Sequence, residues 1–329
     1  RIDFSNDAKG ALLLEPTRLQ LIQYSEDFEN AYWSKNTGTT VTNNFAISPN
    51  GTLNATRFLG TGNIGISRQF TTNSGQNYTV SFYVKSNTNQ NQNCRLLFDS
   101  SNVSSDFAVT TEWEKISFTS NSGGLANKAM GIFNGSNQGN IDILIYGAQL
   151  EQGSYATSYI PNFGNSAGAT RSADVCNNGG NEQVINSTEG VLYAEISALD
   201  NPTSQEIALS VSEGQSGVNR LLIRMKTNGR IGIVLRVANT TEASIDSGVL
   251  DQSVNHKVAV KWKVNDIALW IDGVEVGTES SANVFSANTL DEVSFNQGNN
   301  SNQFYGNTKD VRVYDTALTD SELQQLTTI

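Results

Sequence analysis

Apolar and polar residues alternate over short stretches along most of the chain. In residues 78–84 the even-numbered positions are apolar and the odd ones mostly polar, the period of a β-strand with one buried face. Phe82 should therefore point into a core and Tyr83 away from it. Residues 141–146 repeat the pattern, with three isoleucines on one face and Asp142, Leu144 and Tyr146 on the other.

Strand-like runs return in the second half of the chain. They cover residues 191–196, 207–211, 221–225, 231–237, 258–264 and 267–271. Asn228-Gly229 lies between two of these runs and predicts a tight hairpin, because both residues reach positive φ at low cost. Asp272-Gly273 predicts another turn, so the second half should be a meander of antiparallel strands.

One helix is predicted close to the end of the chain. Thr319 and Glu322 have the spacing of a capping box, in which each side chain bonds the backbone of the other residue. Leu323 and Leu326 follow on one face. This helix should cover part of the second sandwich.

The length and the strand pattern favour two domains rather than one. A chain of 329 residues is long for a single sandwich. We expect a segment or linker over residues 1–20, a β-sandwich over 21–160, a connector over 161–187 and a second β-sandwich over 188–329. The predicted fold class is all-β, with two tandem antiparallel sandwiches and a short C-terminal helix.

Composition and charge exclude some classes of partner. Only 16% of the residues are charged and the net charge is -11, which would repel a nucleic-acid backbone. No stretch approaches the roughly 18 consecutive apolar residues of a membrane span, so a membrane partner is not expected. The chain begins at Arg1 without a methionine or a leader pattern, and we expect it to be a fragment of a longer protein.

Residues for catalysis are sparse, and we predict that the protein is not an enzyme. Glu195 and Asp200 are five positions apart and would lie on opposite faces of a strand, unlike the facing carboxylates of a glycosidase. His256 is the only histidine, and we assign it a structural role. No nucleophile elbow, phosphate loop or dinucleotide fingerprint that is flanked by the right strand and helix patterns is present in the sequence. Cys94 and Cys176 fit no metal spacing and are predicted to be unpaired thiols, although a disulfide between them stays open.

No cofactor is predicted, with one reservation about calcium. Calcium at a loop edge uses carboxylates and backbone carbonyls, which leave little trace in a sequence. Asp27, Asp142 and Asp310 are the candidate ligands for such a structural ion.

Strand parity also selects candidate ligand-binding residues in the second half. In residues 267–271 the odd positions are apolar and inward, so Trp270 faces outward, as a ligand platform, a partner contact or a partly buried side chain. Trp262 shares the inward parity and is predicted to be core. Arg220 and Arg224 share one strand face, and Arg236 has the outward parity on its own strand. Two interpretations remain open for these arginines: they line the Trp270 surface, or they only solvate it.

The first half offers an analogous outward set. Tyr83, Arg95 and Tyr146 are the candidate ligand-binding residues there, although exposed tyrosines are also common on sandwich strands.

Several motifs in the first half resemble modules of bacteriophage tail-fibre and head-fibre proteins. The motifs are residues 11–18 (ALLLEPTR), 21–28 (LIQYSEDF) with Trp33, 78–85 (YTVSFYVK), 148–153 (AQLEQG), 156–161 (ATSYIP) and 170–174 (TRSAD). The resemblance implies a carbohydrate-binding jelly roll.

The second half resembles a concanavalin-like, laminin-G-like jelly roll. The matching stretches are residues 256–262 (HKVAVKW), 269–273 (LWIDG), 304–306 (FYG), 310–314 (DVRVY) and 317–319 (ALT). That superfamily contains lectins, adhesive modules and glycosidases, so the fold alone does not choose a function.

Together the resemblances imply a protein on the virion surface, in a tail or head fibre or as a capsid decoration. The expected partners are host-surface or environmental polysaccharides and other virion proteins, and a homo-oligomer stays open. Two alternatives remain: a purely structural virion module without glycan binding, and a polysaccharide-degrading enzyme of concanavalin-like fold.

Overall fold

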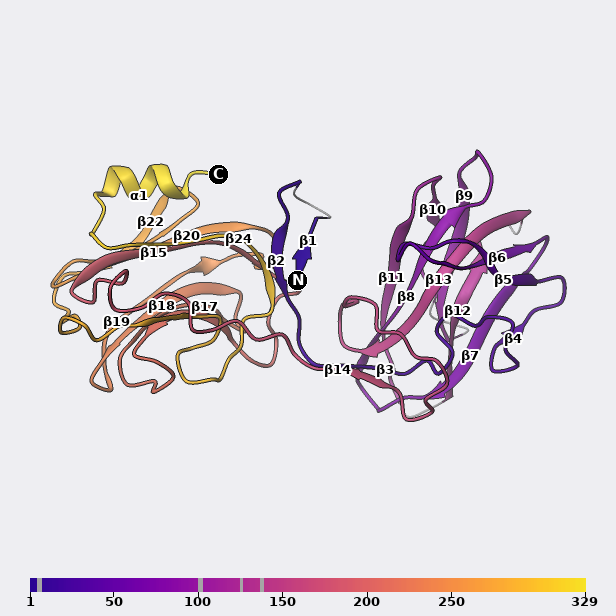
Figure 1. Ribbon diagram of the computed structural model, residues 1–329, viewed down its shortest axis with the longest axis horizontal. Coiled ribbons are helices and arrows are strands. Elements are labelled where there is room, and N and C mark those ends of the chain that lie inside the picture. Colours follow the sequence, from indigo (N-terminus) through magenta and orange to yellow (C-terminus); the bar gives the residue numbers. More distant parts are fainter. Residues whose placement is uncertain (5–7, 100–102, 125–126, 137–138) are drawn as a thin grey trace. The chain divides into compact units, whose positions relative to one another are not determined.

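The computed structural model describes residues 1–329 except 5–7, 100–102, 125–126 and 137–138. The chain forms two compact units. We call Thr17–Ser172 the first sandwich, and Arg1–Pro16 together with Ala173–Ile329 the second sandwich (Figure 1).

The first sandwich contains two antiparallel sheets of five strands. One sheet has the order β11 (Glu114–Asn121), β8 (Asn77–Ser86), β13 (Ile141–Gln152), β6 (Leu53–Gly60) and β5 (Thr40–Ile47). The other has the order β10 (Phe107–Val109), β9 (Gln92–Phe98), β12 (Asn127–Asn134), β7 (Gly65–Thr71) and β4 (Ser34–Lys35).

The core of the first sandwich lies between these sheets and follows the predicted parity. Phe82 and the isoleucines of β13 enter it from one sheet, and Leu96 and Ile132 enter from the other. Trp33 is buried in the same core. Alternation with a period of two therefore identified the inner face correctly.

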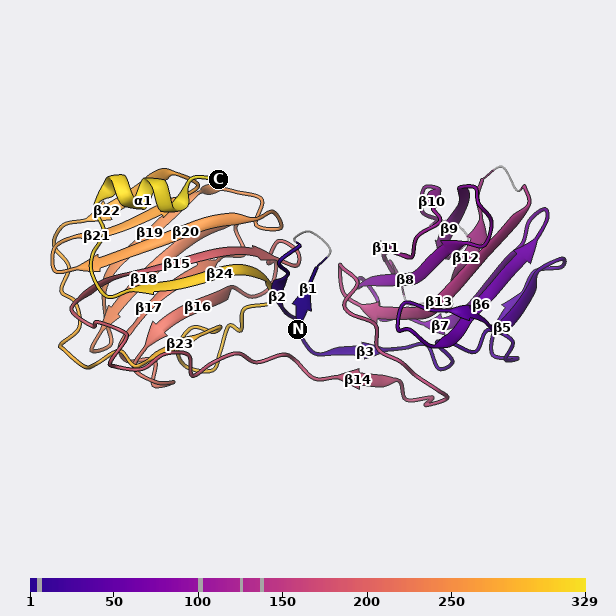
Figure 2. The same cartoon turned by 45° about the horizontal axis from the view of Figure 1, so that its top comes forward.

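The second sandwich packs a sheet of seven strands on a sheet of five. The larger sheet has the order β1 (Ile2–Asp3), β2 (Ala11–Leu14), β24 (Gly306–Tyr314), β15 (Glu189–Ala198), β20 (His256–Lys263), β21 (Ile267–Ile271) and β22 (Val274–Glu279). The smaller has the order β19 (Thr240–Val249), β18 (Arg230–Val237), β17 (Arg220–Met225), β16 (Ile207–Ser212) and β23 (Glu292–Ser294). Figure 2 shows the two layers.

The predicted turns and the predicted core residues of the second sandwich are present. β17 and β18 form an antiparallel hairpin whose turn contains Gly229 at φ 75°. Asp272 and Gly273 both have positive φ between β21 and β22. Trp262 is fully buried in the core between the sheets, as its parity predicted.

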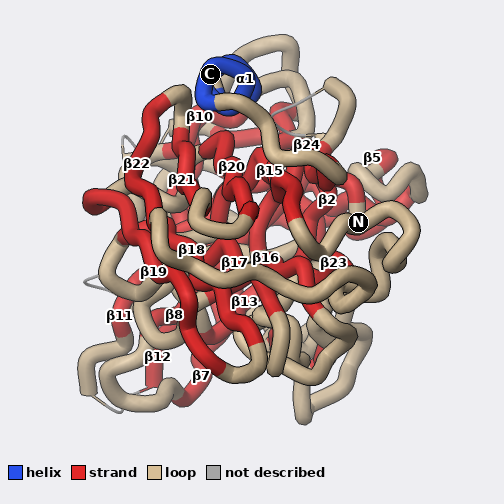
Figure 3. The backbone as a smooth tube through the Cα atoms, turned by 90° about the vertical axis from the view of Figure 1, so that its left-hand side faces the viewer, coloured by secondary structure: helices blue, strands red, loops and turns tan. Residues whose placement is uncertain are grey.

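The single helix among the described residues is α1 (Asp320–Thr327). Thr319 and Glu322 form the predicted capping box. The helix lies against the larger sheet (Figure 3). Its Leu323 packs with Trp270 on the outer face of that sheet. No helix in the described part of the chain has the length and apolar character that crossing a bilayer requires. The all-β fold with one C-terminal helix is thus confirmed.

The prediction of a linker over residues 1–20 is wrong. β2 pairs with β24, which is almost the whole chain length away in sequence. The first part of this segment therefore supplies strands to the second sandwich. β3 (Arg18–Gln20) pairs instead with β14 (Ala169–Arg171), which lies inside the predicted connector 161–187. In both segments the strands form because the backbone pairs with a strand far away in the sequence. Such pairing leaves no local pattern in the sequence.

Candidate functional site

A polar cleft of about 880 Å³ lies at one end of the first sandwich. It is lined by loops and strand ends of both sheets: Gly38, Thr40, Leu59, Gly60, Thr61, Thr88, Gln90, Asn91, Gln92, Asn93, Asn134, Gly135, Gly139, Asn140, Ile141 and Asp142. Its size falls within the range of small-molecule binding sites, roughly 300–1,000 Å³.

Six of the lining residues are asparagine or glutamine. Gln90, Asn91 and Asn93 are exposed, and their side-chain amides make no hydrogen bond within the described residues. A carboxamide offers both a donor and an acceptor group in one plane. The cleft therefore presents several free donor and acceptor groups that carry no charge.

Asn134 holds the base of the cleft at the end of β12. Its side chain is 2% exposed, and its Nδ2 donates to the backbone carbonyls of Gly62 and Gly139. Its Oδ1 is buried and has no hydrogen-bond partner among the described residues. Leaving a buried acceptor unpaired costs roughly 1–3 kcal/mol, so the two hydrogen bonds donated by Nδ2 fix this side chain at an energetic cost.

Asp142 is the one charged residue among the described lining residues, and it is already paired. Arg57 Nε and Nη2 donate to its two carboxylate oxygens at 2.8 and 2.7 Å. This hydrogen-bonded guanidinium, aided by Asn87, lowers the pKa of the Asp142 carboxyl against the opposing effect of burial. The carboxylate stays ionised and is neutralised by Arg57, so the described lining of the cleft carries no free charge.

Side chains on strand ends give the cleft its shape. Gln92 exchanges two hydrogen bonds with the backbone of Asp142, at 2.6 Å through its Oε1 and at 2.7 Å through its Nε2. Thr61 Oγ1 donates to Asn140 Oδ1 at 2.7 Å. These contacts join the start of β9 to β13, and the residue after β6 to the residue before β13. The cleft is therefore held by the fold itself.

Sequence reasoning missed this cleft. Residues 87–93 read only as a polar loop, and residues 139–142 as the start of a strand. The available signal was the density of carboxamides, since six of the seven residues from 87 to 93 are asparagine or glutamine. The sequence did not show that other loops converge on the same place.

Trp270 is outward on its strand but does not offer an open surface. It is 7% exposed, because α1 covers it and Leu323 packs against it. The prediction of an exposed ligand platform at Trp270 is therefore wrong, and the alternative of burial is correct.

Arg224 and Arg236 do not line the Trp270 surface. They belong to β17 and β18 in the smaller sheet, whereas Trp270 belongs to the larger sheet. Outward side chains of two sheets that pack face to face point in opposite directions. Arg224 contacts Glu206 and Asp246 at 3.5 and 3.6 Å, and Arg236 Nε donates to the carbonyl of Asn239.

The first-half candidates are also divided between sheets. Tyr83 and Tyr146 are cross-strand neighbours on β8 and β13, with ring centroids 6.0 Å apart. Tyr146 is 4% exposed, and its hydroxyl contacts Glu26 and Asn50. Arg95 lies on β9 in the other sheet, 3.9 Å from Asp106, so the predicted three-residue set does not exist.

The candidate catalytic residues Glu195, Asp200 and His256 are all engaged in contacts within the protein, and Asp200 Oδ1 accepts from the backbone of Asn201 at 2.8 Å. Glu195 lies opposite Asp310 on β24, but Glu195 accepts from Asn255 and Asp310 pairs with Arg312 at 2.5 Å. The two ring nitrogens of His256 face Asp272 Oδ2 at 2.6 Å and the Asp251 carbonyl at 2.9 Å.

Cys94 and Cys176 are free thiols, as predicted, and burial raises the pKa of Cys94 to about 12. The contacts of His256 and the raised pKa of the Cys94 thiol favour structural roles for these two residues.

The carboxylates considered for calcium have other partners. Asp27 accepts from Asn30 and Asn43, while Asp142 and Asp310 pair with arginines. The described residues contain no cluster of three or more histidine, cysteine or acidic side chains that could hold a metal.

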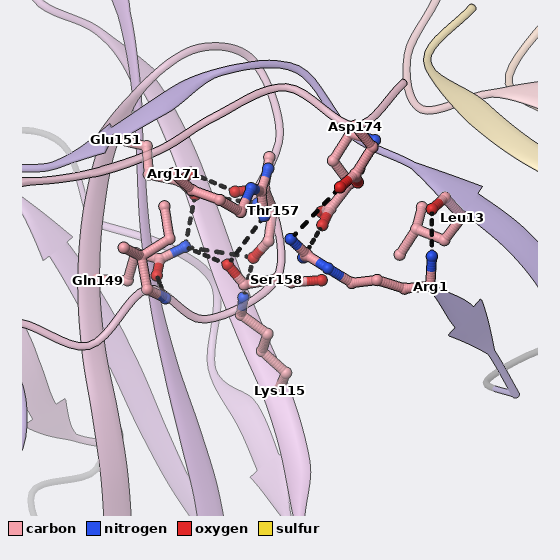
Figure 4. Close-up of polar contacts among 11 residues, drawn as sticks. Arg1, Leu13, Lys115, Gln149, Glu151, Thr157, Ser158, Arg171 and Asp174 are labelled. Carbon is pink, nitrogen blue, oxygen red and sulfur yellow. Dashed lines mark hydrogen bonds and ion pairs between the residues drawn. The ribbon is translucent and has the colours of Figure 1, made fainter. Parts of the chain in front are cut away.

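Residues from the fibre-like motifs meet in a buried polar cluster of the first sandwich (Figure 4). Glu151 is fully buried and accepts from Gln149 Nε2 at 2.7 Å and from the Thr157 backbone at 2.9 Å. Gln149 Oε1 accepts from the Ile160 backbone. Arg171 donates to the carbonyl of Ser158. These motif residues hold residues 157–160 against β13, so they serve the fold.

Comparison with known proteins places the fold of the second half. Residues 181–324 match the family profile of the concanavalin A-like lectin/glucanase superfamily. No curated protein sequence matches the chain.

Among solved structures, a CBM40 of a Ruminococcus gnavus IT-sialidase, bound to α2,3-sialyllactose, is 22% identical with a TM-score of 0.37. The match covers 43% of this chain and 83% of that one. A pentraxin from Limulus polyphemus is 15% identical with a TM-score of 0.35, covering 45% of this chain and 72% of that one. Similarity at this level says nothing about the ligand of this chain.

The match to the superfamily profile and the packing of the two sheets agree with each other. Residues 181–324 include β15 to β24, which build both layers of the second sandwich. The second half of the chain thus carries a concanavalin A-like, laminin-G-like domain.

Proposed function

We propose that this chain is a non-catalytic adhesion protein that binds an uncharged stretch of polysaccharide in the cleft of the first sandwich. The observation that carries the proposal is the lining of the cleft, with six carboxamides and one carboxylate that Arg57 already neutralises. Sugar hydroxyls donate and accept hydrogen bonds, as carboxamides do. A neutral ligand also avoids the cost of desolvating a charge.

The cleft suits a polar ligand better than an apolar one. The described lining contains no aromatic residue, and its aliphatic side chains are Leu59 and Ile141. Binding would rest on hydrogen bonds, each worth only about 0.5–1.5 kcal/mol net. Single sites should therefore be weak, and a protein that presents several copies would gain affinity through multivalency.

A binding assay with cleft variants tests this proposal. The purified protein is applied to a glycan array, and a neutral hit is then titrated by calorimetry. We expect Asn91→Ala to weaken binding about 2- to 10-fold, because it removes one carboxamide contact. Gln90→Ala should act similarly. Neither side chain bonds within the described residues, so folding should be preserved.

Asn89→Ala is the matched control. Asn89 is exposed in the same loop but is not among the residues that line the cleft, so its replacement should change the affinity less than twofold. Silence of the wild-type protein across many glycans would contradict the proposal. A purely structural role would then be the better account.

We place the protein on a bacteriophage surface, within a tail or head fibre or as a capsid decoration. The support is the resemblance of the motifs at residues 11–18, 21–28 with Trp33, 78–85, 148–153, 156–161 and 170–174 to fibre modules. Antibodies against the purified protein should label intact virions in electron micrographs. Labelling of host cells alone would contradict this location.

The absence of catalysis is part of the same proposal. Glu195 and Asp310 are directly opposed on β15 and β24, and each already has a partner. Incubation with bacterial capsular or algal polysaccharides should release no reducing ends. Release that disappears in Glu195→Gln or Asp310→Asn would show an enzyme instead.

A further inference from the structure

Two arginines lie side by side on the outer face of the smaller sheet in the second sandwich. Arg220 on β17 is directly opposite Arg236 on β18 in the strand register. Like charges in directly opposed positions on neighbouring strands destabilise a sheet. The pair therefore needs a physical account.

Neither arginine has a carboxylate partner within the described residues. Arg220 Nη1 donates to the carbonyl of Gln297 at 2.8 Å, and Arg236 Nε donates to the carbonyl of Asn239 at 3.0 Å. The next outward arginine on β17, Arg224, contacts two carboxylates. In a chain with a net charge of -11, an arginine pair without a counter-ion is a local exception.

Arg220 is also nine-tenths buried. It is 9% exposed, and its Nε is a buried donor without a partner among the described residues. Burial, together with the positive charge of Arg236, lowers the pKa of Arg220. A buried charge without a partner is costly unless another group compensates for it.

The surrounding loops fix Arg220 in place. Glycine turns with positive φ at Gly217 and Gly298 pack against its side chain, and a Cβ on Gly217 would lie 3.3 Å from Arg220 Nη1. The acidic residues of these loops already accept hydrogen bonds from other groups. Glu213 accepts from Asn219, Asp291 accepts from the backbone of Gly214, and Glu292 accepts from Gln215.

We propose that Arg220 and Arg236 form a binding site for an oxyanion, the carboxylate or sulfate ester of an acidic saccharide. Guanidinium groups bind such oxyanions through paired, charge-assisted hydrogen bonds. One anion between the two arginines would remove their repulsion and supply the missing acceptor groups. The negative charge of the whole chain opposes general anion binding, which makes a local pair of cations necessary.

The test measures the affinity of the whole chain for chosen probes. A tetrasaccharide that contains glucuronate, a sulfated glucose tetrasaccharide, the neutral glucose tetrasaccharide and sodium sulfate are titrated by calorimetry at constant ionic strength. We expect saturable binding of at least one anionic saccharide. Its Kd should rise about tenfold or more in Arg236→Gln, because a charge-assisted hydrogen bond to the anion is lost.

Arg312→Gln is the matched control, since it makes the same change of charge on the outer face of the larger sheet of the same sandwich. Its Kd should stay within about twofold of wild type, the scatter expected where only long-range charge changes. Arg220→Gln is a second variant, checked for folding by its melting curve. Because Arg236 is only half-buried, Arg236→Gln keeps the test valid if Arg220→Gln fails to fold.

The possible results of the titrations either support the oxyanion site or overturn it. Sulfate that binds as well as the saccharides, and only when Arg236 is present, supports the oxyanion site and identifies a free anion as its ligand. Equal weakening by Arg312→Gln, or no anion binding that depends on Arg236, overturns the proposal. Asn91→Ala should leave anion binding unchanged, so failure of this site and failure of the cleft are distinguishable.

Discussion

Trp270 in the second sandwich and Tyr146 in the first both point away from the core of their own unit, yet both are covered. Trp270 is 7% exposed and Tyr146 is 4% exposed. The cover over Trp270 is the apolar face of α1, which buries Leu323. The cover over Tyr146 is polar and consists of Glu26, Asn50 and the ring of Tyr159.

The polar group of the aromatic side chain has hydrogen-bond partners under one cover and none under the other. The Tyr146 hydroxyl contacts Glu26 at 3.2 Å and Asn50 at 3.0 Å. The indole Nε1 of Trp270 is buried and has no partner among the described residues. An outward face thus became a second apolar core in one unit and a hydrogen-bonded network in the other. Strand parity predicts the face of the sheet on which a side chain lies. Whether that face is exposed to water depends on other segments of the chain that pack over it.

The largest effect is expected from Trp270→Ala. Removing this ring leaves a cavity under α1 and should lower the free energy of unfolding of the second sandwich by about 3–5 kcal/mol. Denaturant unfolding followed by far-UV circular dichroism measures the loss. Val274→Ala on the neighbouring strand, 63% exposed, is the control and should be nearly neutral. A neutral Trp270→Ala would show that α1 does not depend on this contact.

A smaller effect is expected from Tyr146→Phe. The ring packing is kept, but Glu26 and Asn50 lose a buried hydrogen-bond partner. We expect a loss of about 1–2 kcal/mol, confined to the unfolding transition of the first sandwich. No change would mean that the polar cover contributes packing alone, as the cover over Trp270 does.

The pH dependence of stability should distinguish the same hydroxyl. Burial, with a contribution from the charge of Glu26, raises the pKa of Tyr146 from 10.0 to about 12. Between these values the unfolded chain loses the proton while the folded chain keeps it, so the free energy of unfolding falls as pH rises. Tyr146→Phe should make this fall shallower in the first sandwich. Burial also raises the pKa of Tyr193, in the second sandwich, to about 12. Tyr193→Phe should therefore make the fall in the free energy of unfolding shallower only in the second sandwich.

Much of the fold could be predicted because a period of two is a local property. The patterns at 78–84, 141–146 and 267–271 placed Phe82, the isoleucines of β13 and Leu269 in the cores correctly. The capping box likewise needs only four consecutive residues. Residues 11–14 were missed because their strand character depends on β24, which begins almost 300 residues later.

The cleft could not be predicted from local sequence patterns, because it also depends on contacts between distant segments. Gln90 and Asn140 lie in different loops, and only the meeting of two sheet ends brings them to one cleft. Arg236 was correctly placed on an outward face, but its neighbour is Arg220 rather than Trp270, because the strand belongs to the other sheet. Parity gives the face within a strand, whereas the sheet to which a strand belongs is a property of the whole topology.

The smallest effect is expected from Trp270→Phe, and its value lies in the contrast with Tyr146→Phe. Phenylalanine loses part of the packing of the indole but also removes an N–H group that is buried without a partner, and each of these effects is of the order of 1–2 kcal/mol. The two effects oppose each other, so the free energy of unfolding should change by less than about 1 kcal/mol. Denaturant unfolding of both variants under the same conditions gives the comparison. A loss as large as that of Trp270→Ala would show that the part of the indole that phenylalanine lacks is needed to hold α1 in place.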